Sequence, residues 1–183
     1  MVLKDAYTEE KVMCFAAELD LEALRDVAAD PALGLTRHVI WRITPGIVLE
    51  YAADSRSRCS FLAVGGYPRD LVQEIEKSIE KNLKPWTLRE VLSAVDRADG
   101  VEELAGAVLR AGVAAPQGFD KKMFKSIKRA ILHIDHRIRY AGLWATAYSR
   151  WSEFRDLIAG VADGDELYTL RRDAQVILHY YSS

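Results

Sequence analysis

Apolar residues recur every three or four positions between residues 8 and 29, which is the spacing of one face of a helix. Val12 and Phe15 belong to this stripe, and the acids that follow residue 8 suit the positive end of a helix dipole. Pro31 ends the pattern, because proline cannot continue a helix. We therefore expect a helix over residues 8–29, with Asp20 leaving open a division into two shorter helices.

The period changes to strand-like alternation after this helix. Residues 39–43 and 47–51 are rich in β-branched and aromatic side chains and are separated by a Thr-Pro-Gly turn, and a third apolar run covers residues 59–64. Short connections between consecutive strands predict a three-stranded antiparallel meander. Three strands are only marginally stable alone, so we expect the face with Val39 and Trp41 to pack on the first helix or on the helical part.

After the third strand the pattern is helical and is interrupted by proline, glycine and capping residues. Thr87, Asp120 and Asp135 stand where helix N-caps are expected. Helices of about 10 to 15 residues joined by tight turns form α-hairpins, and several in a row predict a solenoid. We therefore expect a mainly α, α+β protein with an N-terminal α/β segment over residues 1–67 and helical repeats over residues 68–183.

Three segments of the helical part share a layout, in which an aliphatic residue follows shortly after an acid and a small residue stands four positions later. The two residues lie on one stripe of a helix, and the small one lets a neighbouring helix approach closely. In two segments an arginine follows the aliphatic residue directly. We expect these arginines, Arg139 and Arg171, to be structural, in a ladder with Asp135 and Asp165 across the turns. The aliphatic and small residues are Val101 and Ala105, Ile138 and Gly142, and Leu170 and Ala174.

This layout resembles the second helix of HEAT-type repeats, in which an acid precedes Val/Leu-Arg and then Ala. The best match covers residues 135–181 and a weaker one covers roughly residues 68–181. The chain looks like a small bacterial HEAT-repeat domain-containing protein with a short N-terminal α/β segment. It departs from the pattern at Glu102, where arginine is expected, and at Gly142, where alanine is commoner. The resemblance implies a short HEAT-like solenoid that binds proteins, or less often nucleic acid, and it implies no enzymatic activity.

The composition is that of a chain that buries a core, with 50% hydrophobic and 28% charged residues, which excludes a disordered protein. No apolar run is long enough to cross a bilayer, and the first residues lack the pattern of a secretory signal. Cys14 and Cys59 are too few for a disulfide framework. We therefore expect reduced thiols, a cytoplasmic location and no membrane partner.

Charge is unevenly distributed, although the net charge is only −2 and disfavours a dedicated nucleic-acid binder. Residues 1–35 hold three bases and eight acids, whereas residues 119–150 hold eight bases and two acids. The helix expected from residue 121 has its bases on one side and Phe124 and Ile127 on the other, so it is either a binding surface or only a solvated face. We expect a partner protein with an acidic surface. The predicted partner-binding residues are Lys121, Lys122, Lys125, Lys128, Arg129, Arg137, Arg150 and Trp151.

No motif in the chain supports catalysis. The sequence has neither a nucleophile elbow nor a glycine-rich phosphate loop. His133 and His136 are the only metal-like pair, and zinc needs three or four ligands held together. We therefore expect no catalytic residue, no metal and no cofactor.

A second class of function stays open, because alkylpurine DNA glycosylases also use a HEAT-like fold. In that reading the candidates for an aromatic cleft are Trp144 and Trp151, and the candidate catalytic acid is Asp156. Those enzymes are larger and more basic, and their catalytic arrangement has no residue-by-residue match in this chain. The leading hypothesis is therefore a non-enzymatic scaffold that binds another protein, with toxin neutralisation (immunity) as a special case. A nucleic-acid-binding protein or a glycosylase-like enzyme is the alternative.

Overall fold

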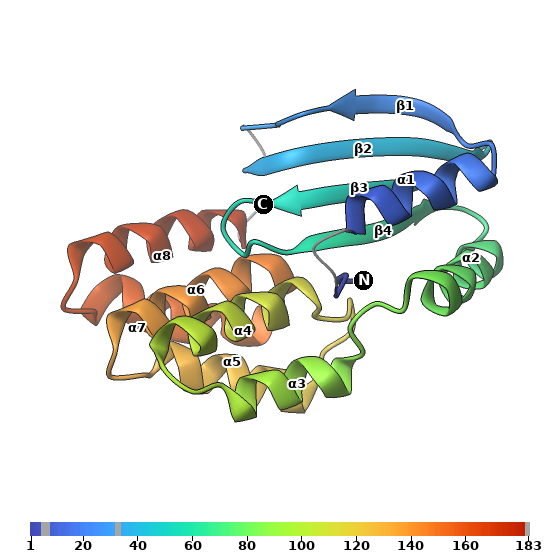
Figure 1. Cartoon of the computed structure of the whole chain (residues 1–183). Helices are drawn as coiled ribbons and strands as arrows, with labels where there is room; N and C mark the ends of the chain where they lie inside the picture. Colours follow the sequence, from blue (N-terminus) through green and yellow to red (C-terminus); the bar gives the residue numbers. More distant parts are fainter. Residues whose placement is uncertain (5–7, 32–33, 182–183) are drawn as a thin grey trace. The chain divides into compact units, whose positions relative to one another are not determined.

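The computed structural model describes residues 1–4, 8–31 and 34–181. In these residues the fold is α+β, with eight α-helices, a short 3-10 helix and one four-stranded antiparallel sheet (Figure 1). Its contacts divide the chain into two compact units, Met1–Trp86 and Thr87–Ser183. The boundary predicted between residues 67 and 68 therefore differs from the division that the structure shows.

The N-terminal unit contains the sheet, whose strands follow one another in the order β1-β2-β3-β4 as a meander. The predicted three-stranded sheet is wrong by one strand, and the predicted helix over residues 8–29 ends early. Asp20 adopts a positive φ of 51°, which stops the helix, and the chain then pairs with β2 from Glu22 to Val27. The elements are α1 (Thr8–Glu18), β1 (Glu22–Val27), β2 (Leu35–Thr44), β3 (Ile47–Asp54) and β4 (Ser60–Gly66).

One face of this sheet packs on α1 and on α2 (Arg69–Leu83). Val39 and Trp41 are buried in this core together with Phe15 of α1, which confirms the predicted inward face. Ile79 of α2 is fully buried in the same core. Helix α2 therefore belongs with the sheet, and this is why the first unit extends to Trp86.

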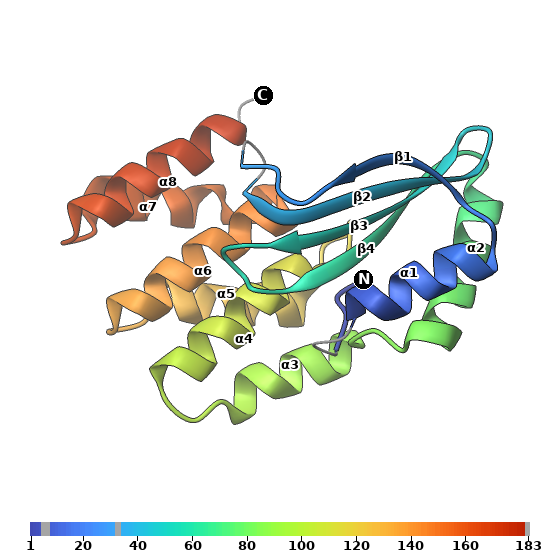
Figure 2. The ribbon, with the colours of Figure 1, turned by 45° about the horizontal axis from the view of Figure 1, so that its top comes forward.

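The C-terminal unit consists of three consecutive α-hairpins, formed by α3 with α4, α5 with α6, and α7 with α8 (Figure 2). Helix α6 packs against both α4 and α8, and α3 packs against α5, so the hairpins lie side by side. The elements are α3 (Leu88–Arg97), α4 (Val101–Val113), α5 (Lys121–Ile131), α6 (His136–Ser149), the 3-10 helix η1 (Ser152–Phe154), α7 (Arg155–Gly164) and α8 (Tyr168–Tyr180).

Three of these helices begin at the predicted N-caps. The Thr87 hydroxyl accepts the Glu90 N–H and the Glu90 carboxylate accepts the Thr87 N–H, which is a capping box. Asp120 accepts two N–H groups of the first turn of α5, and Asp135 accepts the N–H of Arg137 in α6. The local sequence therefore determines where α3, α5 and α6 start.

Small residues bring α6 close both to α4 and to α5. A Cβ on Gly142 would lie 2.6 Å from the Ile131 nitrogen, and one on Gly112 would lie 2.5 Å from the Cα of Ala145. Ala174 is fully buried, so the predicted small residues of the second and third repeats are at packed positions. In the first repeat Ala105 is only half-buried, and Gly112, two turns later, makes the close contact instead.

Candidate functional site

A groove of about 1360 Å³ lies between α3 and α5 within the C-terminal unit. Two half-buried leucines, Leu88 and Leu92, contribute apolar surface to it, and Ser93 and Ser126 contribute hydroxyls. The cations that line it are Arg89 and Arg97 of α3 and Lys121, Lys122, Lys125 and Arg129 of α5.

The amphipathic pattern of α5 places its bases in this groove. Met123, Ile127 and Ile131 are at most 1% exposed, so they anchor one face of the helix and turn the lysines outward. On α3, Val91 and Val95 are buried in the same way and leave the arginines exposed. The predicted two-sided character of the basic helix is therefore confirmed.

In the part of the chain that the structure describes, most of the groove cations have side chains without a partner. No hydrogen bond or ion pair to a described residue is formed by the side chains of Arg89, Arg97, Lys121, Lys122 and Lys125. The exception is Arg129, whose Nη2 lies 3.0 Å from Oδ1 of Asp96 across the groove. Asp120, the other acid of the groove, uses its carboxylate to cap α5. The walls therefore present positive charge that residues 1–4, 8–31 and 34–181 leave without an ion-pair partner.

The remaining predicted binding residues lie elsewhere. Lys128 is exposed on α5 but does not line the groove. Arg137 is held by Asp135 and by Glu102, at 2.8 and 3.3 Å. Arg150 is exposed at the C-cap of α6, with a positive φ of 53°. The structure thus brings together four of the eight predicted residues and leaves these three and Trp151 outside the groove.

Trp151, the last of the eight predicted binding residues, is buried and only 5% exposed. Its Nε1–H donates to the carbonyl of Pro116 at 3.1 Å, and its ring stacks on Phe154 with 5.9 Å between centroids. Phe119 packs edge-on against the indole and is itself 47% exposed. The aromatic residue at the surface is therefore Phe119, and Trp151 is part of the core beneath it.

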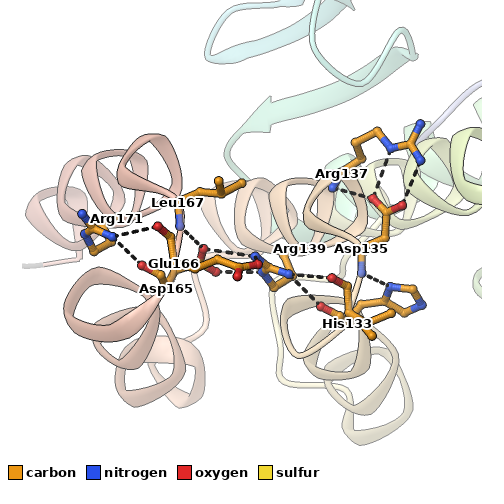
Figure 3. Close-up of polar contacts among 9 residues, drawn as sticks. His133, Asp135, Arg137, Arg139, Asp165, Glu166, Leu167 and Arg171 are labelled. Carbon is orange, nitrogen blue, oxygen red and sulfur yellow. Dashed lines mark hydrogen bonds and ion pairs between the residues drawn. The ribbon is translucent and has the colours of Figure 1, made fainter.

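Arg139 is the centre of a polar network that joins the turns before α6 and α8 (Figure 3). Its guanidinium donates to both carboxylate oxygens of Asp165, at 2.8 and 3.2 Å, and to the carbonyl of Ile134 at 2.8 Å. Arg171 donates to the carbonyl of Asp165 at 2.6 Å. These contacts confirm the predicted structural role of both arginines across the turn.

The predicted ladder is wrong at Asp135, which does not bind either of the two arginines through its carboxylate. Asp135 binds Arg137 of its own helix, at 2.8 and 3.1 Å, and its carboxylate makes no contact with Arg139 (Figure 3). The bonds from the Arg137 side chain and backbone lower the pKa of Asp135. Burial raises the pKa of Asp165, but the bonds from Arg139 and from the Leu167 N–H outweigh it and hold the pKa below its ordinary value.

Sequence reasoning missed the α3 wall of the groove. Arg89 and Arg97 are eight residues apart and so share one helix face, which was a usable signal. Glu90 and Asp96 obscured it, because they balance the two arginines in the sequence. In the structure Glu90 is engaged in the capping box and Asp96 in the pair with Arg129.

Two of the residues considered for chemistry, His133 and Trp144, have structural partners. The Nδ1 of His133 accepts the Asp135 N–H at 3.0 Å, and Trp144 donates to Asp173 at 3.2 Å. In residues 1–4, 8–31 and 34–181, no group of three or more His, Cys, Asp or Glu side chains is arranged to hold a metal ion. Within the same ranges, no helix has the length and apolar content needed to cross a membrane.

Comparisons with protein-family models, with curated proteins and with solved structures found no match. The fold and the site therefore define the chain only as an α+β protein with a basic groove between two helices.

Proposed function

We propose that this protein is a non-enzymatic interaction protein, whose C-terminal unit is a short HEAT-like scaffold that binds an acidic segment of a partner protein between α3 and α5. The observation that carries the proposal is the set of five cations on the walls of the groove whose side chains pair with none of the described residues. The side-by-side hairpins and the Arg139–Asp165 contact between turns support the HEAT-like part.

The positive charge is local to the groove. The C-terminal unit as a whole has fourteen Lys and Arg residues and thirteen Asp and Glu residues, so it is close to neutral. The groove has six cations and two acids, and both acids are engaged. Such a concentrated field attracts and orients an acidic segment more than it attracts anions in general.

The shape of the site favours a protein segment over duplex DNA. Packed helices lie only about 8–10 Å apart, whereas a duplex presents a broad surface of phosphates. The groove cations line a concavity between two such helices, and the chain carries a net charge of −2. Duplex DNA is therefore the alternative that a binding experiment must exclude.

The proposal includes a cytoplasmic location and allows an acidic toxin as the partner. Cys14 and Cys59 are both free thiols, which suits a reducing compartment. An immunity role would need the same basic groove, because neutralisation by contact requires only tight and specific binding.

The test compares two anionic probes and two charge-reversal variants. Fluorescence anisotropy would measure binding of a poly-glutamate peptide of about twelve residues, roughly 18 Å long if helical, and of a short DNA duplex. The groove variant is Arg97→Glu/Lys125→Glu. The control is Lys77→Glu/Arg155→Glu, which makes the same charge change at exposed residues outside the groove.

We expect the peptide to bind wild type and the control alike, with an affinity that falls as salt is raised. The groove variant should bind about tenfold or more weakly, because each reversal costs about 1 kcal/mol near the surface. Equal weakening in both variants, or tighter binding of the duplex than of the peptide, would contradict the proposal.

A further inference from the structure

The groove runs along both helices that form it. Its wall residues repeat every four positions, with Arg89, Ser93 and Arg97 on α3 facing Lys121 and Lys125 on α5. Eight residues of helix span about 12 Å, which sets the length of the walls. The bridge from Asp96 to Arg129 joins the last turns of the two helices, so both helices run in the same direction.

The volume of the groove suits a polypeptide segment. Pockets for small ligands enclose about 300–1,000 Å³. The groove between α3 and α5 encloses about 1360 Å³ and is open to solvent along the exposed Arg89 and Lys125 side chains. A small anion would leave most of this space, including the surface of Leu92, without a contact.

The backbone of the groove disfavours an extended segment. A bound strand gains its affinity from main-chain hydrogen bonds to a sheet edge. Both walls here are helices, whose N–H and C=O groups are bonded internally apart from the first and last turns. A bound helix satisfies its own backbone and needs only side-chain contacts, so it is the form of peptide that two helices can accept.

We infer that the occupant of the groove is a short amphipathic helix of a partner protein, with an aliphatic stripe that contacts Leu88 and Leu92 and with acids on both flanks. This inference rests on the proposed function and adds the secondary structure and pattern of the partner segment. Carboxylates at intervals of four residues on one flank match Lys121 and Lys125, and those on the other flank match Arg89 and Arg97.

The experiment uses the full chain and two labelled peptides of identical composition, rich in Glu and Leu. In one peptide the leucines recur at i, i+3, i+4 and i+7, and in the other the order is scrambled. Titration would give the dissociation constants, and circular dichroism would follow the helix content of each peptide on binding.

A variant at the apolar surface of the groove separates the contribution of apolar contacts to peptide binding from that of charge. Leu92→Ala removes apolar surface from the groove without changing its charge, and Leu132→Ala, at a leucine that is 64% exposed and outside the groove, is the matched control. Thermal unfolding of both variants would show that each one folds.

We expect the amphipathic peptide to bind about tenfold more tightly than the scrambled one and to gain helix content. Leu92→Ala should remove most of this difference, and Leu132→Ala should preserve it. If both peptides bind alike and both weaken in Arg97→Glu/Lys125→Glu, the helical occupant is refuted and the proposed function stands. If that charge variant binds the amphipathic peptide as tightly as wild type, both are refuted.

Discussion

At the scale of single residues, the contact between Arg139 and Asp165 joins two half-buried charges through several hydrogen bonds. Their side chains are only 12% and 5% exposed, and the guanidinium also donates to Glu166 and to two carbonyls. A buried charge that loses its partner is strongly destabilising, because its desolvation is no longer offset. The pair should therefore matter more for stability than the exposed bridge between Arg129 and Asp96.

We predict that Asp165→Asn lowers the free energy of unfolding by about 3 kcal/mol at neutral pH. The folded protein holds the pKa of Asp165 below its ordinary value of 3.8, so this stabilisation is present above about pH 4 and is lost as the pH falls through the lowered pKa. Urea unfolding at pH 7 and pH 3 would measure both effects. Asp163→Asn, at an exposed acid two residues earlier, should change neither. If the free energies of unfolding of Asp165→Asn and wild type differ as much at pH 3 as at pH 7, the stabilisation does not depend on ionised Asp165 and the prediction is refuted.

At the scale of elements, the packing of α6 against α4 and α5 depends on two glycines that have no room for a side chain. Gly112 faces the backbone of Ala145, and Gly142 faces the backbone that joins Ala130 to Ile131. Backbone atoms cannot rotate away as a flexible side chain can, so a methyl group there would push the helices apart. Gly106, in the same helix as Gly112, has open space where its Cβ would be.

We predict that a change from glycine to alanine destabilises the protein at positions 112 and 142 and stabilises it at position 106. Gly112→Ala and Gly142→Ala should each lower the free energy of unfolding by about 1–3 kcal/mol through overpacking. Gly106→Ala should raise it by about 0.5–1 kcal/mol, because alanine loses less backbone entropy in a helix. Thermal or chemical unfolding would measure all three variants. Stabilisation by all three would show that the helices are not in close contact.

At the scale of the whole molecule, the division into Met1–Trp86 and Thr87–Ser183 assigns α2 to the sheet. Val72 and Ile79 of α2 are 4% and 0% exposed, and Ile79 belongs to the core formed with the sheet. A cut before α2 would uncover this apolar stripe, whereas a cut after Trp86 leaves it in place.

We predict that a fragment of residues 87–183 is a monomer, unfolds cooperatively and keeps the peptide affinity of the full chain. A fragment of residues 68–183 should bind more of a hydrophobic dye and tend to self-associate, because α2 exposes Val72 and Ile79. Dye fluorescence and light scattering of the two fragments would compare them. Equal dye binding by both would mean that α2 does not need the sheet.

Features set by local chemistry could be predicted from the sequence. The caps at Thr87, Asp120 and Asp135 and the two-sided pattern of α5 follow from neighbouring residues, because a cap bonds N–H groups two or three positions away. One wall of the candidate site, formed by Lys121 and Lys125, was therefore visible in the sequence.

Features set by distant contacts needed the tertiary structure. Strand β1 has five exposed residues in a row and so lacks an alternating pattern; it is a strand because its backbone pairs with β2. The sequence did not show what would cover the apolar surfaces of α2 and Trp151. The pairing of α3 with α5, which creates the groove, depends likewise on packing between hairpins that are far apart in sequence.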